Sequence, residues 1–127
     1  MNFFPSRDAA VEFVTAFLRL VEHRDLDEAS LCLSQEVKII FPGRRRFTDL
    51  HEQVASSRTR FITVQKEFER FDVIDNPHSV VVYAIGELSG TDAHGREFSG
   101  VRFIDRFTII DGLITEHTVW NDFAAAG

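Results

Sequence analysis

The sequence is poor in cysteine, proline and basic residues, and it has no apolar run near the roughly 20 residues that a membrane-spanning helix needs. Its single cysteine, Cys32, cannot form an internal disulfide, and its apolar neighbours favour a buried side chain over a reactive thiol. Fourteen basic against 20 acidic residues give a net charge of −6, which argues against a nucleic-acid partner. Met1 to Pro5 lacks the basic start of a signal peptide, so we expect a cytoplasmic protein with no membrane partner.

The chain also lacks the patterns of common metal, nucleotide and hydrolase sites. It contains no Cys-x-x-Cys, no glycine-rich phosphate loop and no nucleophile elbow. The five histidines do not have the spacing of metal ligands; they are His23, His51, His78, His94 and His117. We therefore expect neither a metal nor a cofactor.

Length and composition indicate one domain that spans residues 1–127, because 44% hydrophobic and 27% charged residues are typical of a globular protein of this size. Ser6 is the expected N-cap of a helix that reaches about His23, since apolar residues recur there at helical spacing. A short helix is expected from about Asp25 to Leu33. A third begins at the capping box Asp49-Leu-His-Glu52 and reaches about Phe61.

Alternating apolar residues then predict strands separated by turns at Asn76-Pro77, Ala93-His94-Gly95 and Asp111-Gly112. The expected strands are Val37 to Phe41, Ile62 to Ile74, Ser79 to Ser89, Phe98 to Ile110 and Leu113 to Phe123. Helices first and a meander last predict an α+β fold, in which a curved antiparallel sheet wraps around the N-terminal helices. Small residues such as Ala84, expected to pair with Phe103, leave room for an internal pocket.

The last hairpin places acids on an apolar face. If Ile110 pairs with Leu113, then Phe107 faces Glu116 and Phe103 faces Trp120, all on the inner side. The inner side then holds three acids, Asp105, Glu116 and Asp122. A purely structural sheet has little reason to bury acids, so they indicate a site. A β-bulge in this hairpin would invert part of the assignment.

The order of elements and several short motifs resemble the SnoaL-like branch of the nuclear transport factor 2-like superfamily over nearly the whole chain. The motifs are Asp25-Leu-Asp27, Phe41-Pro-Gly43, Asp105-Arg-Phe107, Asp111-Gly-Leu-Ile114, Glu116-His117, Trp120 and Asp122. The resemblance implies a cone-shaped barrel with a deep pocket, and a homodimer packed through the outer face of the sheet. Members include polyketide cyclases, ketosteroid isomerases, dehydratases, epoxide hydrolases and proteins that only bind ligands.

The resemblance carries over only in part. Asp122 lies where polyketide cyclases are thought to keep an acid/base aspartate, but the partner histidine is missing, because His117 is expected to point outward. The epoxide-hydrolase arginine is replaced by Phe103, and the ketosteroid-isomerase tyrosine has no match, since the sole tyrosine, Tyr83, is on a strand. Each known chemistry therefore lacks one member.

The candidate catalytic residues each have a structural alternative. Asp122 is either a general base with a raised pKa or a strand-end carboxylate that meets solvent. Asp105 is either a proton carrier or a structural hydrogen-bond acceptor. Glu116 either takes part in chemistry or forms a salt bridge with the run Arg44-Arg45-Arg46, which itself either binds an anionic ligand or is a solvated loop.

The candidate ligand-binding residues share an apolar character and an expected inward direction: Trp120, Phe103, Phe13, Phe17, Val101 and Ala84. Core packing is the alternative for the aromatic ones. The sequence thus predicts a pocket for a small hydrophobic organic molecule. The protein is either a cofactor-independent isomerase, cyclase or dehydratase, or a non-catalytic ligand-binding protein or dimeric scaffold. Tyr83, Ile85, Ile104 and Val119 are expected on the outer face that forms the homodimer.

Overall fold

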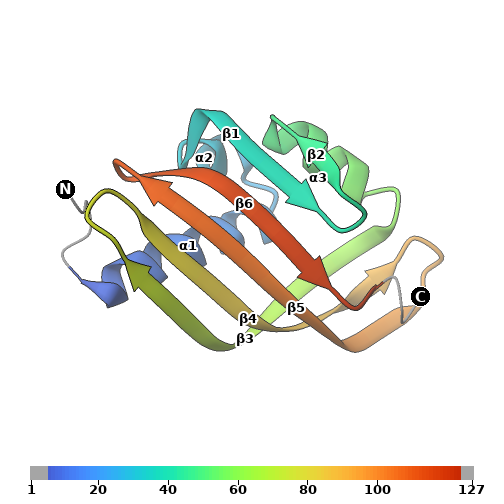
Figure 1. Cartoon of the computed structure of the whole chain (residues 1–127). Coiled ribbons are helices and arrows are strands. Elements are labelled where there is room, and N and C mark those ends of the chain that lie inside the picture. Colours follow the sequence, from blue (N-terminus) through green and yellow to red (C-terminus); the bar gives the residue numbers. More distant parts are fainter. Residues whose placement is uncertain (1–5, 124–127) are drawn as a thin grey trace.

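The computed structural model describes residues 6–123, which form three helices and six strands (Figure 1). In chain order they are α1 (Arg7–Glu22), α2 (Leu26–Ser30), β1 (Leu33–Phe41), β2 (Arg45–Phe47), α3 (Leu50–Ser57), β3 (Phe61–Asp75), β4 (Val80–Asp92), β5 (Glu97–Ile110) and β6 (Leu113–Asn121). The predicted α+β class is confirmed. No helix among these residues is long and apolar enough to cross a membrane.

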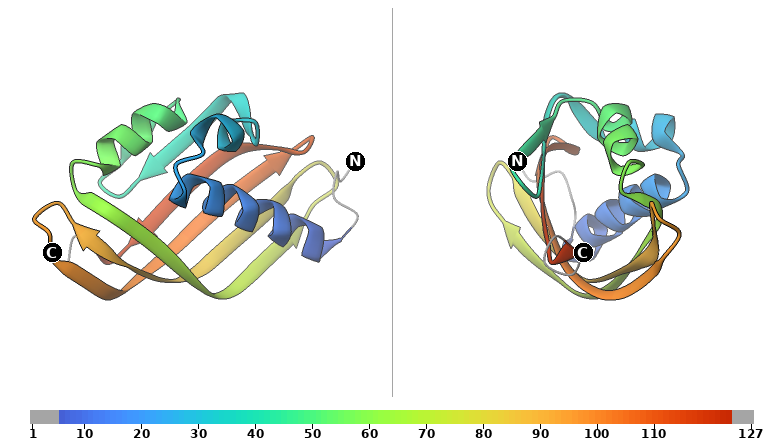
Figure 2. Two further views of the ribbon diagram at one scale, coloured as in Figure 1. Left: turned by 180° about the vertical axis from the view of Figure 1, so that it is seen from behind. Right: turned by 90° about the vertical axis from the view of Figure 1, so that its right-hand side faces the viewer.

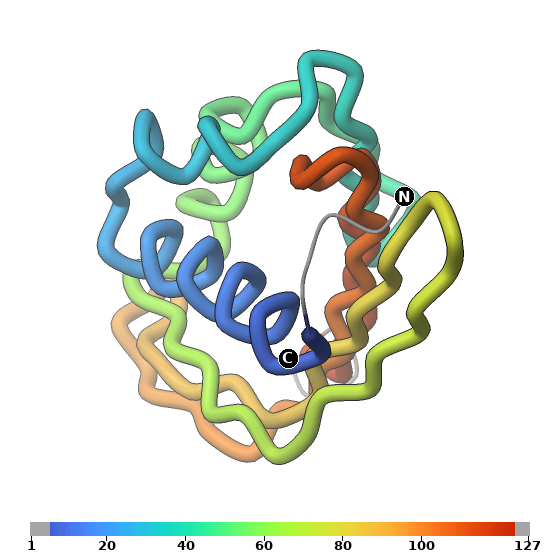
Figure 3. The backbone as a smooth tube through the Cα atoms, turned by 90° about the vertical axis from the view of Figure 1, so that its left-hand side faces the viewer, coloured from blue at the N-terminus to red at the C-terminus, as the bar shows by residue number. Residues whose placement is uncertain are grey.

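The six strands form one curved sheet in the order β2-β1-β6-β5-β4-β3. The predicted antiparallel meander is confirmed for β3 to β6, whereas β1 pairs with β6 in parallel, which the sequence analysis did not predict. The sheet has two free edges, β2 and β3, so the predicted barrel is wrong: the sheet curves strongly but does not close. Figures 2 and 3 show α1 lying within this curve, on the concave face.

Helix α1 begins at the predicted N-cap, where Oγ of Ser6 accepts a hydrogen bond from the N–H of Ala9 at 3.1 Å. Its apolar stripe faces the sheet, and Val14, Phe17 and Leu18 are buried there. These side chains join the concave face of β4 and β5, including Phe103 and Phe107, in one hydrophobic core. The other helices are shorter than predicted, and α3 ends at Ser57 because the chain enters β3 at Phe61.

The arginine run is part of a hairpin as well as of a loop. Gly43 and Arg44 both have positive φ (82° and 60°), so the chain reverses there, and Arg45 pairs with Phe41 at the start of β2. This strand was not predicted.

The closing hairpin contains a β-bulge that decides which side chains of β6 face inward. The predicted pairing of Ile110 with Leu113 is confirmed, and Asp111 and Gly112 have the positive φ values of a type I′ turn (53° and 78°). Thr108 then pairs with Glu116, and Thr115 is the extra residue. Its hydroxyl donates a hydrogen bond to the carbonyl of Thr108 at 3.2 Å.

The bulge makes the predicted register wrong beyond the turn. Phe107 pairs with His117 instead of Glu116, so His117 and Val119 face the core. Between β4 and β5 the pairing is also shifted, because Ala84 pairs with Asp105 and not with Phe103. That shift is two residues, so Ala84 keeps its predicted inward direction, whereas the one-residue bulge reverses every side chain after it.

Candidate functional site

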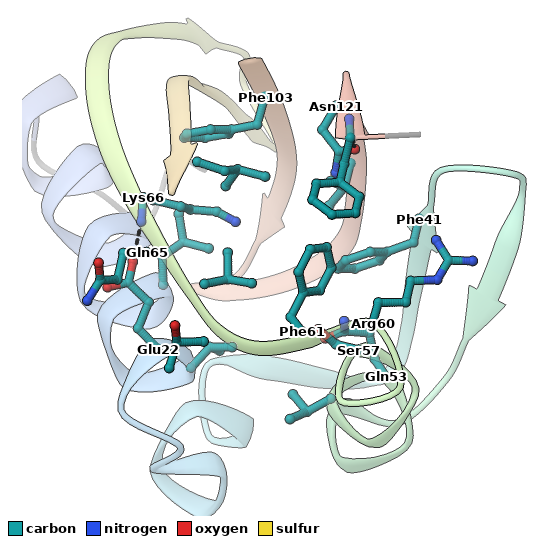
Figure 4. Close-up of a pocket in the computed structure, with 18 of the residues that line it drawn as sticks. Glu22, Phe41, Gln53, Ser57, Arg60, Phe61, Gln65, Lys66, Phe103 and Asn121 are labelled. Atoms are coloured by element: carbon teal, nitrogen blue, oxygen red, sulfur yellow. Dashed lines mark hydrogen bonds between the residues drawn. The ribbon is translucent and has the colours of Figure 1, made fainter. Parts of the chain in front are cut away.

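A cavity of about 420 Å³ lies between the concave face of the sheet, α1 and α3. Aromatic rings form much of its wall, including Phe17 from α1, Phe61 from β3 and Phe103 from β5 (Figure 4). The volume is in the range of pockets that hold a small organic molecule. Two basic side chains, Lys66 and His117, interrupt the apolar wall in its deeper part, and three arginines lie nearer the solvent.

Behind this wall is a fully buried carboxylate. Asp105 on β5 has no exposed surface, and its Oδ2 lies 3.1 Å from Nζ of Lys66 and 3.4 Å from Nε2 of His117. Neither contact has hydrogen-bond geometry, and among the described residues both carboxylate oxygens and Nε2 lack a hydrogen-bond partner. The three side chains come from β3, β5 and β6, and we call them the Asp105 cluster.

Lys66 is held at the boundary between the cluster and the cavity. Its side chain is 16% exposed, and Nζ lies 5.0 Å from the centre of the Phe103 ring, within the range of a cation–π contact. Its backbone N–H donates to Oε2 of Glu22 at 3.1 Å, an interaction visible in Figure 4. This contact ties β3 to the end of α1, while Asp105 and Phe103 hold the ammonium group.

His117 is held by aromatic rings. Its imidazole stacks on Phe107 at 4.2 Å with an interplanar angle of 13°, and it meets Phe17 and Phe41 edge-on at 5.9 and 6.0 Å. Only 6% of the residue is exposed, yet it lines the cavity. One nitrogen therefore faces Asp105 while the ring borders the space open to a ligand.

Opposing influences set the charge of Asp105. Burial raises the pKa of its carboxyl, but the Lys66 ammonium and the His117 imidazole lower it by more, so the pKa lies below its ordinary value. Asp105 is therefore an anion at neutral pH and balances the charge of Lys66. The prediction that Asp105 is inward and buried is confirmed, but it lies behind Lys66 and His117 and does not line the cavity.

The other two predicted acids face away from the cavity. Asp122 accepts a hydrogen bond from Nε of Arg102 on the outer face, and Glu116 lies 3.6 Å from Arg106 and not against the Arg44 to Arg46 run. Trp120 is 50% exposed. The prediction that these three side chains point inward is wrong, because the extra residue at Thr115 reverses β6 beyond it.

The predicted apolar ligand contacts divide into two groups. Phe17 and Phe103 line the cavity. Val101 and Ala84 are buried in the core beneath the wall, and Phe13 packs against that core without lining the cavity. Contact of any of these residues with a ligand stays a prediction. The outer-face assignment of Val119 and His117 is wrong, since both are buried on the inner side.

Two residues of the site were missed by the sequence analysis. Lys66 lies two residues from both Val64 and Phe68 along β3 and therefore shares their face of the strand. This period of two was a signal in the sequence for the inward direction of Lys66. His117 was noted but placed on the wrong face. The described residues contain no group of three His, Cys, Asp or Glu side chains that could hold a metal. Burial, followed by the Glu28 carboxylate, raises the pKa of the Cys32 thiol, which disfavours the reactive thiolate.

No protein-family model matches the chain, and no curated protein has a significantly similar sequence. Solved structures do resemble it. An NTF2-like protein of unknown function from Burkholderia pseudomallei K96243 is 17% identical, with a TM-score of 0.73, over 91% of this chain and 92% of that chain. A protein assigned as a SnoaL-like polyketide cyclase from Jannaschia sp. CCS1 is 20% identical, with a TM-score of 0.69, over 99% of this chain and 94% of that chain.

A third similar structure is TerC co-crystallised with polyporic acid, which is 18% identical with a TM-score of 0.69, over 91% of this chain and 93% of that chain. At such identities structural similarity establishes the fold and not the reaction. The helix within a curved, open, mostly antiparallel sheet is the arrangement that these structures share with this chain. The chain therefore has the cone-shaped α+β fold that these NTF2-like and SnoaL-like structures share.

Proposed function

We propose that the cavity binds a small, mostly apolar carbonyl compound and that His117 exchanges a proton with it. The observation that carries the proposal is the position of His117, which borders the cavity while its Nε2 lies 3.4 Å from the buried Asp105. The co-crystal of TerC with polyporic acid and the neighbours assigned as polyketide cyclases support a small organic molecule as the ligand.

The Asp105 carboxylate selects the tautomer of His117. A neutral imidazole beside a carboxylate places its proton on the nitrogen that faces the carboxylate, which is Nε2, and leaves Nδ1 to accept a proton. A base of this kind can remove a proton next to a carbonyl. The anionic Asp105 then stabilises the imidazolium until the proton returns to the substrate at another position.

Lys66 supplies the charge that such a reaction needs. Removing a proton next to a carbonyl places negative charge on the carbonyl oxygen, and a fixed cation in a wall shielded from water stabilises that charge. Lys66 lines the cavity and its ammonium is held by Asp105 and Phe103, so little reorganisation is required. The reaction class is therefore an isomerisation or an intramolecular carbon–carbon bond formation, with no net oxidation.

Ligand binding without chemistry is the second candidate function, and one observation favours it. Asp105 is already paired with Lys66 and is sealed from the cavity, as expected of a structural ion pair. In that case the cluster only holds β3, β5 and β6 together and gives the wall a polar spot for the ligand.

A model ketone separates the two candidates. We expect 2-tetralone, an aromatic ketone with acidic protons next to the carbonyl, to bind in the cavity and to exchange those protons in D2O, as measured by proton NMR. His117→Gln should reduce the exchange rate by on the order of 100-fold, the usual contribution of a positioned base, and should leave calorimetric affinity within a few-fold.

Trp120→Phe is the matched control, because Trp120 is an aromatic residue of the same strand on the outer face. It should change neither exchange nor affinity. Wild-type protein that binds 2-tetralone without accelerating exchange over buffer would establish binding without this chemistry. Equal exchange by His117→Gln and wild type would contradict the role of His117.

A further inference from the structure

The cavity is lined with positive charge although the whole chain carries a net charge of −6. Four permanent cations line it, namely Arg24, Arg45, Arg60 and Lys66, against a single carboxylate, Glu22. That carboxylate is already taken, because Glu22 pairs with Arg19 at 2.9 Å and accepts the backbone N–H of Lys66. The wall therefore offers positive charge and no free carboxylate among the described residues.

The three arginines differ from Lys66 in having no acidic partner. Within residues 6–123, none of them forms an ion pair with a carboxylate. Arg45 donates only to uncharged groups, the carbonyl of Pro42 at 3.1 Å and Oγ of Ser56 at 3.3 Å. Arg60 is exposed, and Arg24 and Arg45 are half-buried, so the arginines lie where the cavity meets solvent while Lys66 and His117 lie deeper. Figure 4 shows Arg60 extending along the wall toward Phe41.

These cations also repel one another. Burial lowers the pKa of Arg45, and the charge of Arg60 lowers it further; burial and the charge of Arg58 do the same to Arg24. The residues concerned surround the C-terminal end of α3, which ends at Ser57. A helix C-terminus offers only about half a negative charge, too little to balance several guanidinium groups. The repulsion between these like charges therefore lowers the stability of the fold, and a bound anion would offset that loss.

We propose that the ligand of this cavity is an apolar molecule with one oxyanion, a carboxylate or phosphate, which binds Arg24, Arg45 and Arg60 at the mouth while its apolar body extends toward Phe17 and Phe103. Guanidinium groups bind such oxyanions through paired, charge-assisted hydrogen bonds. The arrangement orients the molecule, because its charged end stays at the mouth and its apolar end reaches His117. The inference rests on the proposed function in that it takes the cavity to be a ligand pocket.

Three naphthalene probes that differ only in the group at position 2 test the charge of the ligand: 2-naphthoate, 2-naphthyl phosphate and the neutral 2-naphthamide. We expect calorimetry at low salt to show at least one anion binding about tenfold or more tightly than 2-naphthamide. Raising the ionic strength should weaken the anions only. The stronger of the two anions identifies carboxylate or phosphate as the natural head group.

Variants locate the charge. Arg24→Gln and Arg60→Gln, whose side chains hold no ion pair in the described chain, should together remove most of the preference for the anion and leave the affinity of 2-naphthamide unchanged. Arg46→Gln is the matched control, since it removes one charge from an exposed position on β2 outside the cavity. It should keep the preference.

Three results would overturn the inference, and the last of them is distinguishable from the first two. Equal affinity for all three probes, or a preference for the anions that survives in Arg24→Gln/Arg60→Gln, would contradict the anionic ligand and leave the proposed pocket function intact. Failure of every probe to bind wild-type protein would contradict both the anionic ligand and the proposed pocket function.

Discussion

Replacing Lys66 by methionine should destabilise the protein strongly at neutral pH. The substitution keeps most of the side-chain volume but removes the ammonium 3.1 Å from the carboxylate of Asp105, which has no exposed surface. Breaking a buried ion pair on one side costs about 3–5 kcal/mol of unfolding free energy. For a domain of this length that loss lowers the melting temperature by roughly 10–20 °C.

The pH dependence gives the prediction its specific signature. In the wild type the pKa of Asp105 is lowered, so its ionisation stabilises the fold above the unfolded pKa of about 4, and that stability is lost as pH falls through the folded pKa. Without Lys66 the largest influence that lowers the pKa of Asp105 is lost while burial still raises it, so the variant gains less stability than the wild type as pH rises.

Urea unfolding followed by circular dichroism at pH 5 and pH 7 measures this effect. The difference between wild type and Lys66→Met should be larger at pH 7 than at pH 5. Arg70→Met, which breaks the exposed pair with Asp72 on the same strand, is the control and should cost at most about 1 kcal/mol at either pH. A second change, Asp105→Leu, should restore much of the stability of Lys66→Met, because it removes the unpaired charge. A pH-independent loss for Lys66→Met would refute the reasoning.

Two further predictions concern the sheet. Gly86→Ala should lower the free energy of unfolding by about 3 kcal/mol or more, because a Cβ at Gly86 would clash with the carbonyl oxygen of Glu67 on β3. Gly95→Ala, with open space around it, should lower it by only about 1 kcal/mol because of the positive φ. Equal melting temperatures for the two variants would contradict this. We also propose a homodimer through the outer face, where Ile104 and Trp120 are 39% and 50% exposed, so sedimentation velocity should give a dimer that Trp120→Glu converts to a monomer. Wild-type protein that sediments as a monomer at micromolar concentration would contradict the proposal.

Local patterns sufficed for the fold class and for most of the helices and strands, but not for β2 or the parallel pairing of β1 with β6. The N-cap at Ser6, the helical spacing that follows it and the Asp111-Gly112 turn depend on neighbours in the sequence, and each was predicted in its observed place. The inward direction of Asp105 also followed from counting along one strand back from that turn. These features need no knowledge of distant parts of the chain.

The site depended on contacts between distant residues. The bulge at Thr115 is stabilised by the carbonyl of Thr108 across the hairpin, and no property of Thr115 itself indicates it. Lys66 and Asp105 both point inward because their charges balance one another, although they lie two strands apart in the sheet. Neither position can be predicted from its own strand alone. Three predicted site residues were therefore wrongly placed inward, His117 and Val119 were wrongly placed outward, and Lys66, which completes the cluster, was not considered.

The bulge at Thr115 decides whether the odd-numbered or the even-numbered residues that follow it on β6 face the cavity. With it, His117, Val119 and Asn121 form part of the inner lining; without it, Glu116, Thr118 and Trp120 would take their places. The gain of a single codon before Glu116 would thus place Glu116 opposite Phe107 and exchange the residues that line the cavity, whereas the loss of Thr115 would remove the bulge and keep His117 opposite Phe107. A fold with such a strand can change the lining of its cavity in one mutational step, without passing through intermediate mixtures of the two linings.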